Sequence, residues 1–461
     1  MTTPRPIVMA PTRLCVVGAG YVGLTAAACM AESGHSVTCL EASPARLSIL
    51  QRGGIPIVEP RLAEMVDRNR QAGRLRFTSD IAEALDGVSH ALLCVGTPPR
   101  ADGTPDLTQI AGAARQLAST IRTDLVLIVK STVPPGTCEA LEILAAEAAQ
   151  PGVRVRVVSN PEFLRESRAV YDFFAPDRIV VGADDAELGR GVADLYPPGP
   201  PVVLCDRRSA ELIKYAANTF LAVKISFANE VAQLCDALGT EAAAVLAGVG
   251  ADHRIGREFL RPGPGYGGSC LPKDVAGFVS LGAAAGTCTD LAEAAEAQNT
   301  RARHSVVERL DSVLGGLAGR RIGVLGLAFK DGTDDTRDSP GLQIVEDLVA
   351  AGADVATYDP LVDARLPAGS RMPTPADAVS GADAIVVTVA SDEYRALDPM
   401  ETAESMAGRV VFDAAGVLDL DVWGSAGLTV YGVGRGVPHS FYPVVWTPLR
   451  WTTARRTAEA A

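Results

Sequence analysis

The residue of this chain best suited to covalent chemistry is a cysteine in a glycine-rich segment. The segment reads Gly265-Tyr-Gly-Gly-Ser-Cys270, and Lys273 and Asp274 follow it. Glycines tolerate positive φ values and let a ligand approach the backbone, and a neighbouring ammonium group can hold a thiol as its thiolate. Such a thiolate can attack an electrophilic carbon. A surface turn with an incidental cysteine is the alternative, and the segment alone leaves both interpretations open.

A second set of residues, near the start of the chain, suits a dinucleotide. Gly18, Gly20 and Gly23 form the pattern G-x-G-x-x-G between the apolar run 13–17 and the alanine-rich stretch 24–33. In this pattern the first glycine makes a tight turn, the second admits the pyrophosphate to the backbone, and the third lets helix and strand pack closely. A purely structural strand-to-helix turn is the alternative.

The acid that ends the next apolar run bears on the choice of cofactor. Glu41 follows the strand-like run 36–40 and can accept a hydrogen bond from a ribose 2′-hydroxyl, whereas it would repel a 2′-phosphate. The sequence therefore predicts NAD. Arg46 keeps NADP open, because a nearby arginine can accommodate the 2′-phosphate.

Three further strand-like runs each end in polar residues. Thr97 follows the run 90–95, Thr132 follows the run 125–129, and Glu162 and Glu166 follow the run 153–158, with helical stretches at 106–121 and 139–149 between the runs. Alternating strands and helices predict a parallel sheet. Ligands bind beyond the carboxyl ends of such strands, so we expect these side chains to face the cofactor crevice. For the threonines, an ordinary role in turns or helix caps is the alternative.

Two long helices are expected in the middle of the chain. Apolar and small residues recur at spacings of three and four between 208 and 238, which predicts a helix of about 30 residues with one buried face: Leu212, Tyr215, Ala216, Thr219, Val223 and Phe227. Lys214 and Asn218 lie one turn apart and project from one face, although a lysine on a helix is more often solvated. A second helix, over 289–317, completes a central spine and dimer surface.

Beyond this spine the pattern indicates a second, smaller α/β domain. The run Arg320–Gly326 and strands at 354–358 and 384–389 predict it. The fold class is therefore α/β, with two Rossmann-like domains and parallel sheets joined by a central long helix and a helical dimerisation region. We place the NAD-binding domain at 1–205, the central region with the cysteine at 206–318, the C-terminal ligand-binding domain at 319–446 and a disordered tail at 447–461.

Composition excludes several classes of function. The chain has 461 residues, 48% of them hydrophobic and 21% charged, with a formal net charge of −13. This balance is that of a folded globular protein and argues against nucleic acid or an anionic membrane as partner. Nine cysteines without C-x-x-C spacing and five scattered histidines predict a reducing cytoplasm and no metal site. No signal peptide or membrane span is expected.

Taken together the motifs resemble those of the UDP-glucose/GDP-mannose 6-dehydrogenase family, over about Arg13 to Arg435. The segments that carry the resemblance are Gly18-x-Gly20-Tyr-Val-Gly23, Lys130-Ser-Thr132-Val-Pro, Asn160-Pro-Glu-Phe-Leu-Arg-Glu166, Lys214-Tyr-Ala-Ala-Asn218, Arg254-Ile-Gly256, Gly265-Tyr-Gly-Gly-Ser-Cys270-Leu-Pro-Lys-Asp274 and Phe329-Lys330. Seven segments in the same order favour the nucleophile interpretation of Cys270. One departure is Leu271, which stands where the family frequently has phenylalanine.

The resemblance implies an NAD-dependent oxidation of a nucleotide sugar at C6, from alcohol to acid, in two hydride transfers. Cys270 would carry the substrate as a thiohemiacetal and then a thioester. Lys214 and Asn218 would stabilise oxygen charge at C6, Asp274 and Thr132 would position water and protons, and Glu166 or Glu162 would be the base for thioester hydrolysis.

It also implies the residues that bind each ligand. The expected cofactor contacts are Gly18, Gly20, Tyr21, Val22, Gly23, Glu41, Arg46, Thr97, Thr132, Glu166, Lys273 and Arg337. The expected substrate contacts are Glu162, Phe163, Leu164, Arg165, Lys214, Asn218, Arg254, Phe259, Leu260, Gly265, Gly267, Phe329, Lys330 and Arg435. Arg254 is expected to arrive from a partner subunit of a homodimer or higher homo-oligomer.

Alternatives remain open at this stage. Tyr266 and the Arg254-Ile-Gly segment are similar to the UDP-glucose branch of the family, but a TDP sugar or GDP-mannose would undergo the same chemistry. One methyl group separates uracil from thymine, and such a difference is worth only about 1–3 kcal/mol in discrimination. A one-step hydroxyacid dehydrogenase would leave Cys270 without a purpose, and a sensor without turnover would not need the full set of catalytic residues.

Overall fold

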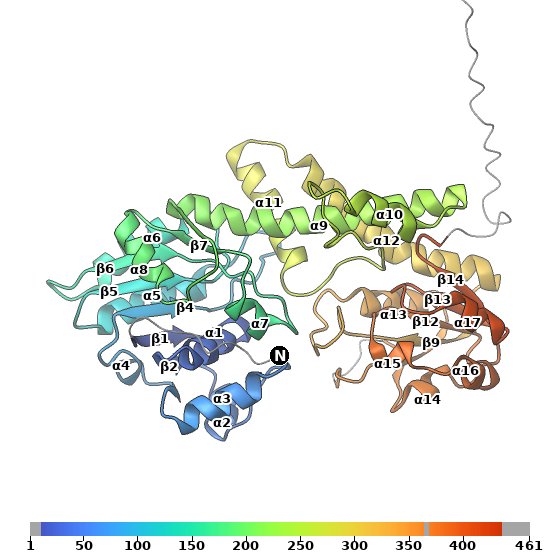
Figure 1. The fold of residues 1–461 in the computed structure, drawn as a ribbon, viewed down its shortest axis with the longest axis horizontal. Coiled ribbons are helices and arrows are strands. Elements are labelled where there is room, and N and C mark those ends of the chain that lie inside the picture. The colour runs from blue at the N-terminus through green and yellow to red at the C-terminus, as the bar shows by residue number, and fades with distance from the viewer. Residues whose placement is uncertain (1–10, 364–367, 436–461) are drawn as a thin grey trace, which may run out of the picture.

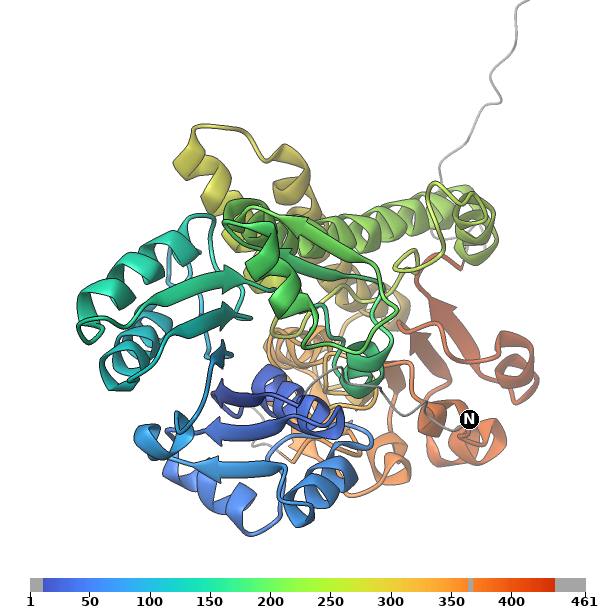
Figure 2. The same cartoon turned by 60° about the vertical axis from the view of Figure 1, so that its left-hand side comes forward.

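Two β-sheets, each covered by helices, lie on the same side of one long helix in the computed structural model, which describes residues 11–363 and 368–435. Figures 1 and 2 show this helix, α9 (Arg207–Leu238), running from the first sheet to the second. The predicted tail at 447–461 and the end of the predicted domain 319–446 lie outside the described residues.

The first sheet has eight strands in the order β3-β2-β1-β4-β5-β6-β7-β8. Every neighbouring pair is parallel except β6 and β7, which are antiparallel. The order of its first six strands is the one found in dinucleotide-binding folds. Its strands are β1 (Arg13–Val17), β2 (Ser36–Leu40), β3 (Leu75–Thr78), β4 (His90–Leu93), β5 (Leu125–Val129), β6 (Val155–Ser159), β7 (Ile179–Gly182) and β8 (Val202–Cys205).

Eight helices accompany this sheet, and apolar clusters fill both of its faces. Burial on both faces explains why these strands read as continuous apolar runs without alternation. The helices are α1 (Tyr21–Glu32), α2 (Pro44–Gln51), α3 (Leu62–Gln71), α4 (Ile81–Ala84), α5 (Thr108–Thr120), α6 (Thr137–Ala148), α7 (Ala169–Phe174) and α8 (Ala186–Ala193). The first helix begins three residues before the expected start at Leu24, because the glycine-rich turn is its first turn.

The central region consists of α9 with α10 (Ala242–Gly250), α11 (Leu271–Ala285) and α12 (Asp290–Leu314). Asp206 caps α9, since its side chain accepts a hydrogen bond from the amide of Ser209, and Gly239 ends the helix in a left-handed conformation. Both long helices were therefore predicted correctly in place and length.

The predicted buried face of α9 is wrong for half of its members, and Val223 is only partly buried. Tyr215 and Thr219 are buried, but Leu212, Ala216 and Phe227 are exposed. The buried face consists of small and polar side chains instead, among them Ala210, Lys214, Asn218, Ala222, Asn229 and Ala232. Small residues let the neighbouring helices approach α9 closely, and the large apolar side chains are left on the outer face.

The second sheet repeats the order of the first six strands of the first sheet, as β11-β10-β9-β12-β13-β14, with all pairs parallel. Its strands are β9 (Arg321–Leu325), β10 (Asp354–Tyr358), β11 (Ser370–Arg371), β12 (Ala384–Val387), β13 (Val410–Asp413) and β14 (Thr429–Gly432). Its helices are α13 (Pro340–Ala350), α14 (Pro375–Val379), α15 (Asp392–Arg395), α16 (Pro399–Ser405) and α17 (Leu420–Ser425). The predicted fold class, two Rossmann-like domains joined by a long central helix, is confirmed.

Candidate active site

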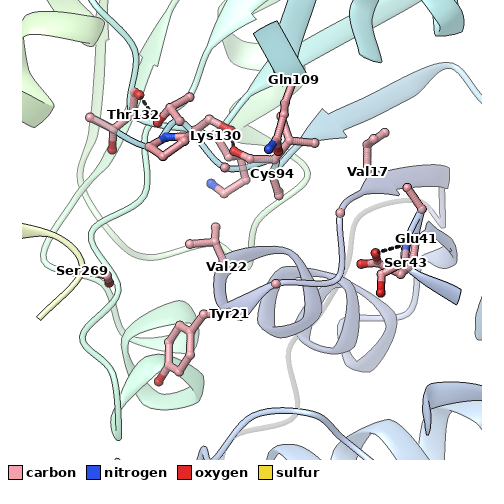
Figure 3. A pocket seen from close by; sticks show the side chains of 18 of the residues that line it. Val17, Tyr21, Val22, Glu41, Ser43, Cys94, Gln109, Lys130, Thr132 and Ser269 are labelled. Carbon is pink, nitrogen blue, oxygen red and sulfur yellow. Dashed lines mark hydrogen bonds between the residues drawn. The ribbon is translucent and has the colours of Figure 1, made fainter. Parts of the chain in front are cut away.

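One cavity of about 1820 Å³ brings together the dinucleotide turn, the cysteine segment and a loop of the second α/β unit. Figure 3 shows Glu41 and Ser43 at one end of this cavity, Ser269 at the other, and Tyr21 and Val22 between them. The expected cofactor contacts that line it are Gly18, Gly20, Tyr21, Val22, Glu41, Arg46, Thr97, Thr132, Glu166, Lys273 and Arg337, and Glu162 and Cys270 line it too.

The three glycines of the turn have three different environments. Gly18 has a φ of +93°, which favours glycine, and a β-carbon on Gly23 would lie 1.9 Å from the carbonyl oxygen of Gly18. Gly23 does not line the cavity, because it lies where α1 packs closely against the turn that follows β1. A β-carbon on Gly20 would meet nothing within 4 Å. The open space at Gly20 fits a pyrophosphate at the start of α1, where backbone N–H groups favour anions.

Glu41 is held in place at the end of β2 by the backbone. Its carboxylate accepts hydrogen bonds from the amides of Ala19 at 2.8 Å and Ser43 at 2.7 Å. Arg46 pairs with the same carboxylate at 3.3 Å. Because Arg46 is engaged by Glu41, its guanidinium is less available to a 2′-phosphate, which favours NAD over NADP.

Cys270 immediately precedes α11 and borders the cavity. The residue is exposed, and the hydroxyl oxygen of Ser269 lies 3.5 Å from its sulfur. Protein atoms around the sulfur raise the pKa of the Cys270 thiol, and the Lys214 ammonium opposes this effect. Lys273, which the sequence suggested as a partner of this thiol, forms its ion pair with Asp274, and Lys214 is the ammonium group that favours the thiolate of Cys270.

Behind the cysteine, α9 contributes a buried ammonium group. The Nζ atom of Lys214 lies 3.1 Å from Oε1 of Glu162, and both side chains are buried. Burial opposes the charge of Lys214, but Glu162, together with Cys270 and Asp274, outweighs it and raises the pKa of Lys214. The lysine is thus a charged group inside the protein and not part of a solvated face.

One turn further along α9, Asn218 donates a hydrogen bond to Oδ2 of Asp274 at 2.6 Å. Asp274 is fully buried and also accepts a hydrogen bond from Lys273. The structure therefore brings together the predicted group of Cys270, Lys214, Asn218, Asp274 and Glu162, drawn from three separate parts of the chain.

Glu166 lies where all three parts of the structure meet. Its carboxylate accepts hydrogen bonds from Ser269 at 3.3 Å and Thr333 at 3.4 Å, and Arg337 lies 4.0 Å away. Burial and the nearby Asp335 carboxylate raise the pKa of Glu166. A carboxyl group with a raised pKa is suited to accept a proton near neutral pH.

The glycines before the cysteine leave no room for side chains. A β-carbon on Gly265 would lie 2.6 Å from the side-chain oxygen of Asn299, and one on Gly267 would lie 2.2 Å from the backbone oxygen of Asp338. On Gly268 it would lie 2.7 Å from the ring of Phe329. The nucleophile segment therefore rests directly on the second α/β unit.

Of the expected substrate contacts, Glu162 lines this cavity, whereas the others, Lys214 and Asn218 included, do not. Arg254 is exposed and pairs with Asp252 at 2.6 Å. Leu260 is buried in an apolar cluster against α9 and α10, so its side chain is not presented to a ligand, and Phe259 before it has a φ of +62°. Arg435 pairs with Asp413 at 3.0 Å and is not part of the cavity lining.

The expected substrate contacts that neighbour Glu162 and Glu166 do not line the cavity either, and their side chains or amides engage other protein groups. The Phe163 ring packs against Arg178, whose guanidinium carbon lies 3.7 Å from the ring centroid, and Leu164 donates its amide to Glu162 at 2.6 Å. The guanidinium of Arg165 donates two hydrogen bonds to Asp172, and its backbone amide donates a third. Lys330 donates to the backbone oxygen of Glu166, and burial lowers its pKa.

Three residues of this site were not predicted individually. Ser269 and Thr333 contact Glu166, and Lys130 is a buried lining residue that donates to Asn160 and to the hydroxyl of Tyr196 at 2.9 Å. Ser269 and Lys130 lie inside segments that carried the family resemblance, which is the signal that could have found them. Thr333 has no such signal, because it contacts Glu166 only through the tertiary fold.

The rate of alkylation of Cys270 should rise steeply with pH above neutrality, because the thiolate reacts and the surrounding protein atoms raise the pKa of this thiol. Lys214→Met should slow the reaction further, since Lys214 stabilises the thiolate. The rates can be followed with iodoacetamide and peptide mass analysis, with the exposed Cys288 as internal reference. A Cys270 rate that is already maximal at neutral pH would contradict the raised pKa.

No group of three or more His, Cys, Asp or Glu side chains within 11–363 and 368–435 could hold a metal ion. None of the helices in that part of the chain is long and apolar enough to cross a membrane.

A doubly wound domain with a dinucleotide turn, joined to a thiol and a buried lysine, defines an NAD-dependent oxidoreductase. Models of the UDP-glucose/GDP-mannose dehydrogenase family match three stretches of the chain: the NAD-binding domain at 12–199, the central domain at 208–301 and the UDP-binding domain at 323–420. The chain belongs to the UDP-glucose/GDP-mannose dehydrogenase family, as its motifs had indicated.

Relatives and solved structures agree with this assignment. UDP-glucose 6-dehydrogenase from Rhizobium meliloti is 40% identical over 435 residues, which cover 92% of this chain and 99% of that protein. The enzyme of the same name from Pseudomonas aeruginosa is 40% identical, over 92% and 97% of the two chains. A UDP-glucose dehydrogenase structure from Pyrobaculum islandicum superposes with a TM-score of 0.86 at 37% identity, over 95% of this chain and 100% of that one.

Proposed function

We propose that this protein oxidises UDP-glucose at C6 to UDP-glucuronate and reduces two molecules of NAD for each acid formed. The observation that carries the proposal is that Cys270 borders the same cavity as the dinucleotide turn, and that the buried Lys214 ammonium is close enough to oppose the rise in the pKa of its thiol. Relatives named UDP-glucose 6-dehydrogenase support the choice of substrate. The match of the C-terminal unit to a UDP-binding domain supports the uridine nucleotide.

The reaction follows from the chemistry of a thiol. NAD, when bound, accepts one hydride in each of the two oxidations. The sulfur of Cys270 adds to the carbon of the aldehyde that the first oxidation leaves, and the thiohemiacetal forms as the thiol proton moves to the oxygen. Loss of a hydride from this carbon and of a proton from its hydroxyl group gives a thioester. Water adds to the thioester carbon, the carbon–sulfur bond breaks, and the acid and the thiol are released.

The buried groups around the thiol have complementary roles in this proposal. Lys214 and Asn218 stabilise negative charge on the C6 oxygen, because both are donors held in a water-poor environment. Asp274 holds Asn218 through the 2.6 Å hydrogen bond and so orients its amide. Thr132 borders the cavity and positions water and protons with Asp274.

Glu166 is the better candidate for the hydrolytic base. Its raised pKa and cavity position suit proton abstraction from water. Glu162 is committed to the Lys214 ion pair and to the amide of Leu164. Glu162 therefore supports the lysine, and Glu166 activates the water.

The nucleotide sugar reaches Cys270 from the side of the C-terminal unit in this proposal. Phe329 and Lys330 already contact the glycine segment and the backbone of Glu166. Phe163, Phe259, Gly265 and Gly267 would contribute mainly shape and backbone contacts, while Arg435 would reach the ligand only after leaving Asp413.

All nine cysteines are free, which supports a reducing compartment such as the cytoplasm.

We further propose that the enzyme is a homodimer built on the outer face of α9. This face carries large exposed apolar side chains at spacings of eight, seven, seven and four, which keep them on one side of the helix: Leu212, Phe220, Phe227, Leu234 and Leu238. Phe220 alone is 64% exposed. A second copy of this chain would cover the face and present its Arg254 to the phosphates of the neighbouring substrate.

Oxidation of UDP-glucose should release two NADH per UDP-glucuronate, with little free aldehyde. Absorbance of NADH, combined with chromatographic measurement of the acid, gives the ratio, and competition among UDP-glucose, TDP-glucose, GDP-mannose and UDP-N-acetyl sugars tests the nucleotide. One NADH per turnover with accumulating aldehyde would favour a single oxidation. Faster turnover of another nucleotide sugar would reassign the substrate and keep the reaction.

Mixed dimers test whether Arg254 acts across subunits. Arg254→Ala and Cys270→Ala chains should each be nearly inactive alone, whereas their heterodimer should recover about a quarter to a half of the wild-type activity, since one of its two sites has both groups. Differently tagged chains, purified as heterodimers, allow this measurement. Absence of recovery in demonstrated heterodimers would contradict supply of the arginine by a partner.

A further inference from the structure

A buried carboxyl group outside the reacting set lies beside the dinucleotide turn. Glu59, between α2 and α3, is 5% exposed. The hydroxyl of Tyr21 donates a hydrogen bond to its Oε2 atom, and the amide of Val170 donates to its Oε1 atom at 3.4 Å. Burial raises the pKa of Glu59, and the amides of Val170, Ala169 and Ser167 oppose this. The two oxygens of the Glu59 carboxyl group thus link Tyr21, in the dinucleotide turn, to Val170, far along the chain.

Tyr21 connects the same carboxyl group to the residue after the proposed base. The amide of Ser167 donates a hydrogen bond to the hydroxyl oxygen of Tyr21 at 2.9 Å. Ser167 has a φ of +63°, a conformation that residues other than glycine rarely adopt. A backbone in this conformation needs support from its surroundings. The Tyr21 hydroxyl provides support by accepting the hydrogen bond from the amide of Ser167.

The side chain of Glu166 is held only loosely by its own hydrogen bonds. The hydroxyl groups of Ser269 and Thr333 lie 3.3 and 3.4 Å from its oxygens, longer than the usual range for O–H···O bonds. The place of this carboxylate therefore depends on the backbone at 166–170. That backbone is fixed by Glu59 and Tyr21 on one side and by Lys330 on the other.

We infer that Glu59 is a positioning residue, which acts with Tyr21 to hold the Glu166 carboxylate in place relative to the dinucleotide turn. The inference rests on the proposed hydrolytic role of Glu166. Glutamate suits the position because its two oxygens accept from two donors, whereas glutamine offers one acceptor and one donor. In Glu59→Gln, either the Tyr21 hydroxyl or the Val170 amide would face an NH₂ group.

Glu59→Gln should therefore slow thioester hydrolysis more than hydride transfer. We expect the steady-state rate to fall about tenfold or more, because small displacements of a catalytic group are costly, while the first NADH molecules still form rapidly. Stopped-flow absorbance should show this burst, intact mass should show acyl-enzyme on Cys270, and the acidic limb of the pH profile of kcat should shift. Glu64→Gln, an exposed carboxylate on α3, is the matched control and should match wild type.

The Tyr21→Phe variant is a second, independent test of the positioning role, because it removes the hydroxyl and leaves Glu59 intact. It should show the same burst, and the double variant should be no slower than the slower single variant. Equal loss of burst and steady-state rate, or a higher KM for NAD with unchanged kcat, would overturn the inference and leave Glu59 a structural support of the turn. If Glu59→Gln does not fold, as judged by its unfolding midpoint, Tyr21→Phe decides alone. Wild-type enzyme that forms no acid from nucleotide sugars would instead refute the proposed function.

Discussion

In a Glu166→Gln variant, NADH should form in a rapid burst that approaches two molecules per active site and then continue slowly. Glutamine keeps the shape of the side chain and its contacts with Ser269 and Thr333 but cannot accept a proton from water. Both hydride transfers should therefore survive, and hydrolysis should become rate-limiting. We expect the steady-state rate to fall by a factor on the order of 10² to 10⁴.

Intact-mass analysis during the slow phase should show an adduct on Cys270. The adduct should disappear with hydroxylamine, which cleaves thioesters, and should be absent when Cys270 is also replaced by alanine. A Glu166→Gln enzyme without a burst, or with a burst but an unmodified cysteine, would place the hydrolytic role elsewhere. Glu162 would then be the next candidate, although its ion pair with Lys214 complicates the same substitution.

Replacing the nucleophile should have a still larger effect on the product. In Cys270→Ala, acid formation should fall by a factor on the order of 10³ or more, because the covalent route to the second oxidation is removed. The first oxidation does not require the thiol, so about one NADH per site should form, and the aldehyde can be trapped with a hydrazine reagent. Binding of NAD should be retained, since Gly18, Gly20 and Glu41 are unchanged.

Cys288→Ala is the matched control for this variant. Cys288 is the other exposed cysteine, so its removal tests whether loss of any accessible thiol affects the rate, and wild-type activity is expected. Acid formation by Cys270→Ala at a rate close to wild type would show that the aldehyde is oxidised without a covalent intermediate.

The sequence predicted those parts of the site that depend on local pattern. The dinucleotide turn, the strands before Thr97 and Thr132, and both long helices follow from periodicity and from glycine positions, and the structure has them at or within a few residues of the expected places. Family resemblance added Lys214 and Asn218, which helix periodicity alone would leave on a solvated face. Local pattern is informative there because the physical cause, backbone geometry or burial, acts over a few residues.

Tertiary packing explains what the sequence did not predict. The apolar residues of α9 were expected to be inside, but this helix buries Lys214 and Asn218 among small residues and leaves Phe220 and Phe227 exposed. The reversal follows from packing, because α9 turns its small and polar side chains toward the neighbouring helices α11 and α12 and leaves its large apolar side chains on the outer face. Similarly, the pKa of Cys270 depends on atoms from distant segments, and Lys273 next to it in sequence is engaged elsewhere.

The contact between Gly268 and Phe329 limits which C-terminal units could replace the one in this chain. An added β-carbon at 268 would lie 2.7 Å from the Phe329 ring, and one at 267 would lie 2.2 Å from the backbone oxygen of Asp338. A C-terminal unit taken from a relative to alter nucleotide preference would have to reproduce this surface within a few tenths of an ångström. A chimaera that missed it would displace the nucleophile, so its turnover would suffer even if its new ligand bound well. The loops at 329 and 338 should therefore be transplanted with the cysteine segment as one piece.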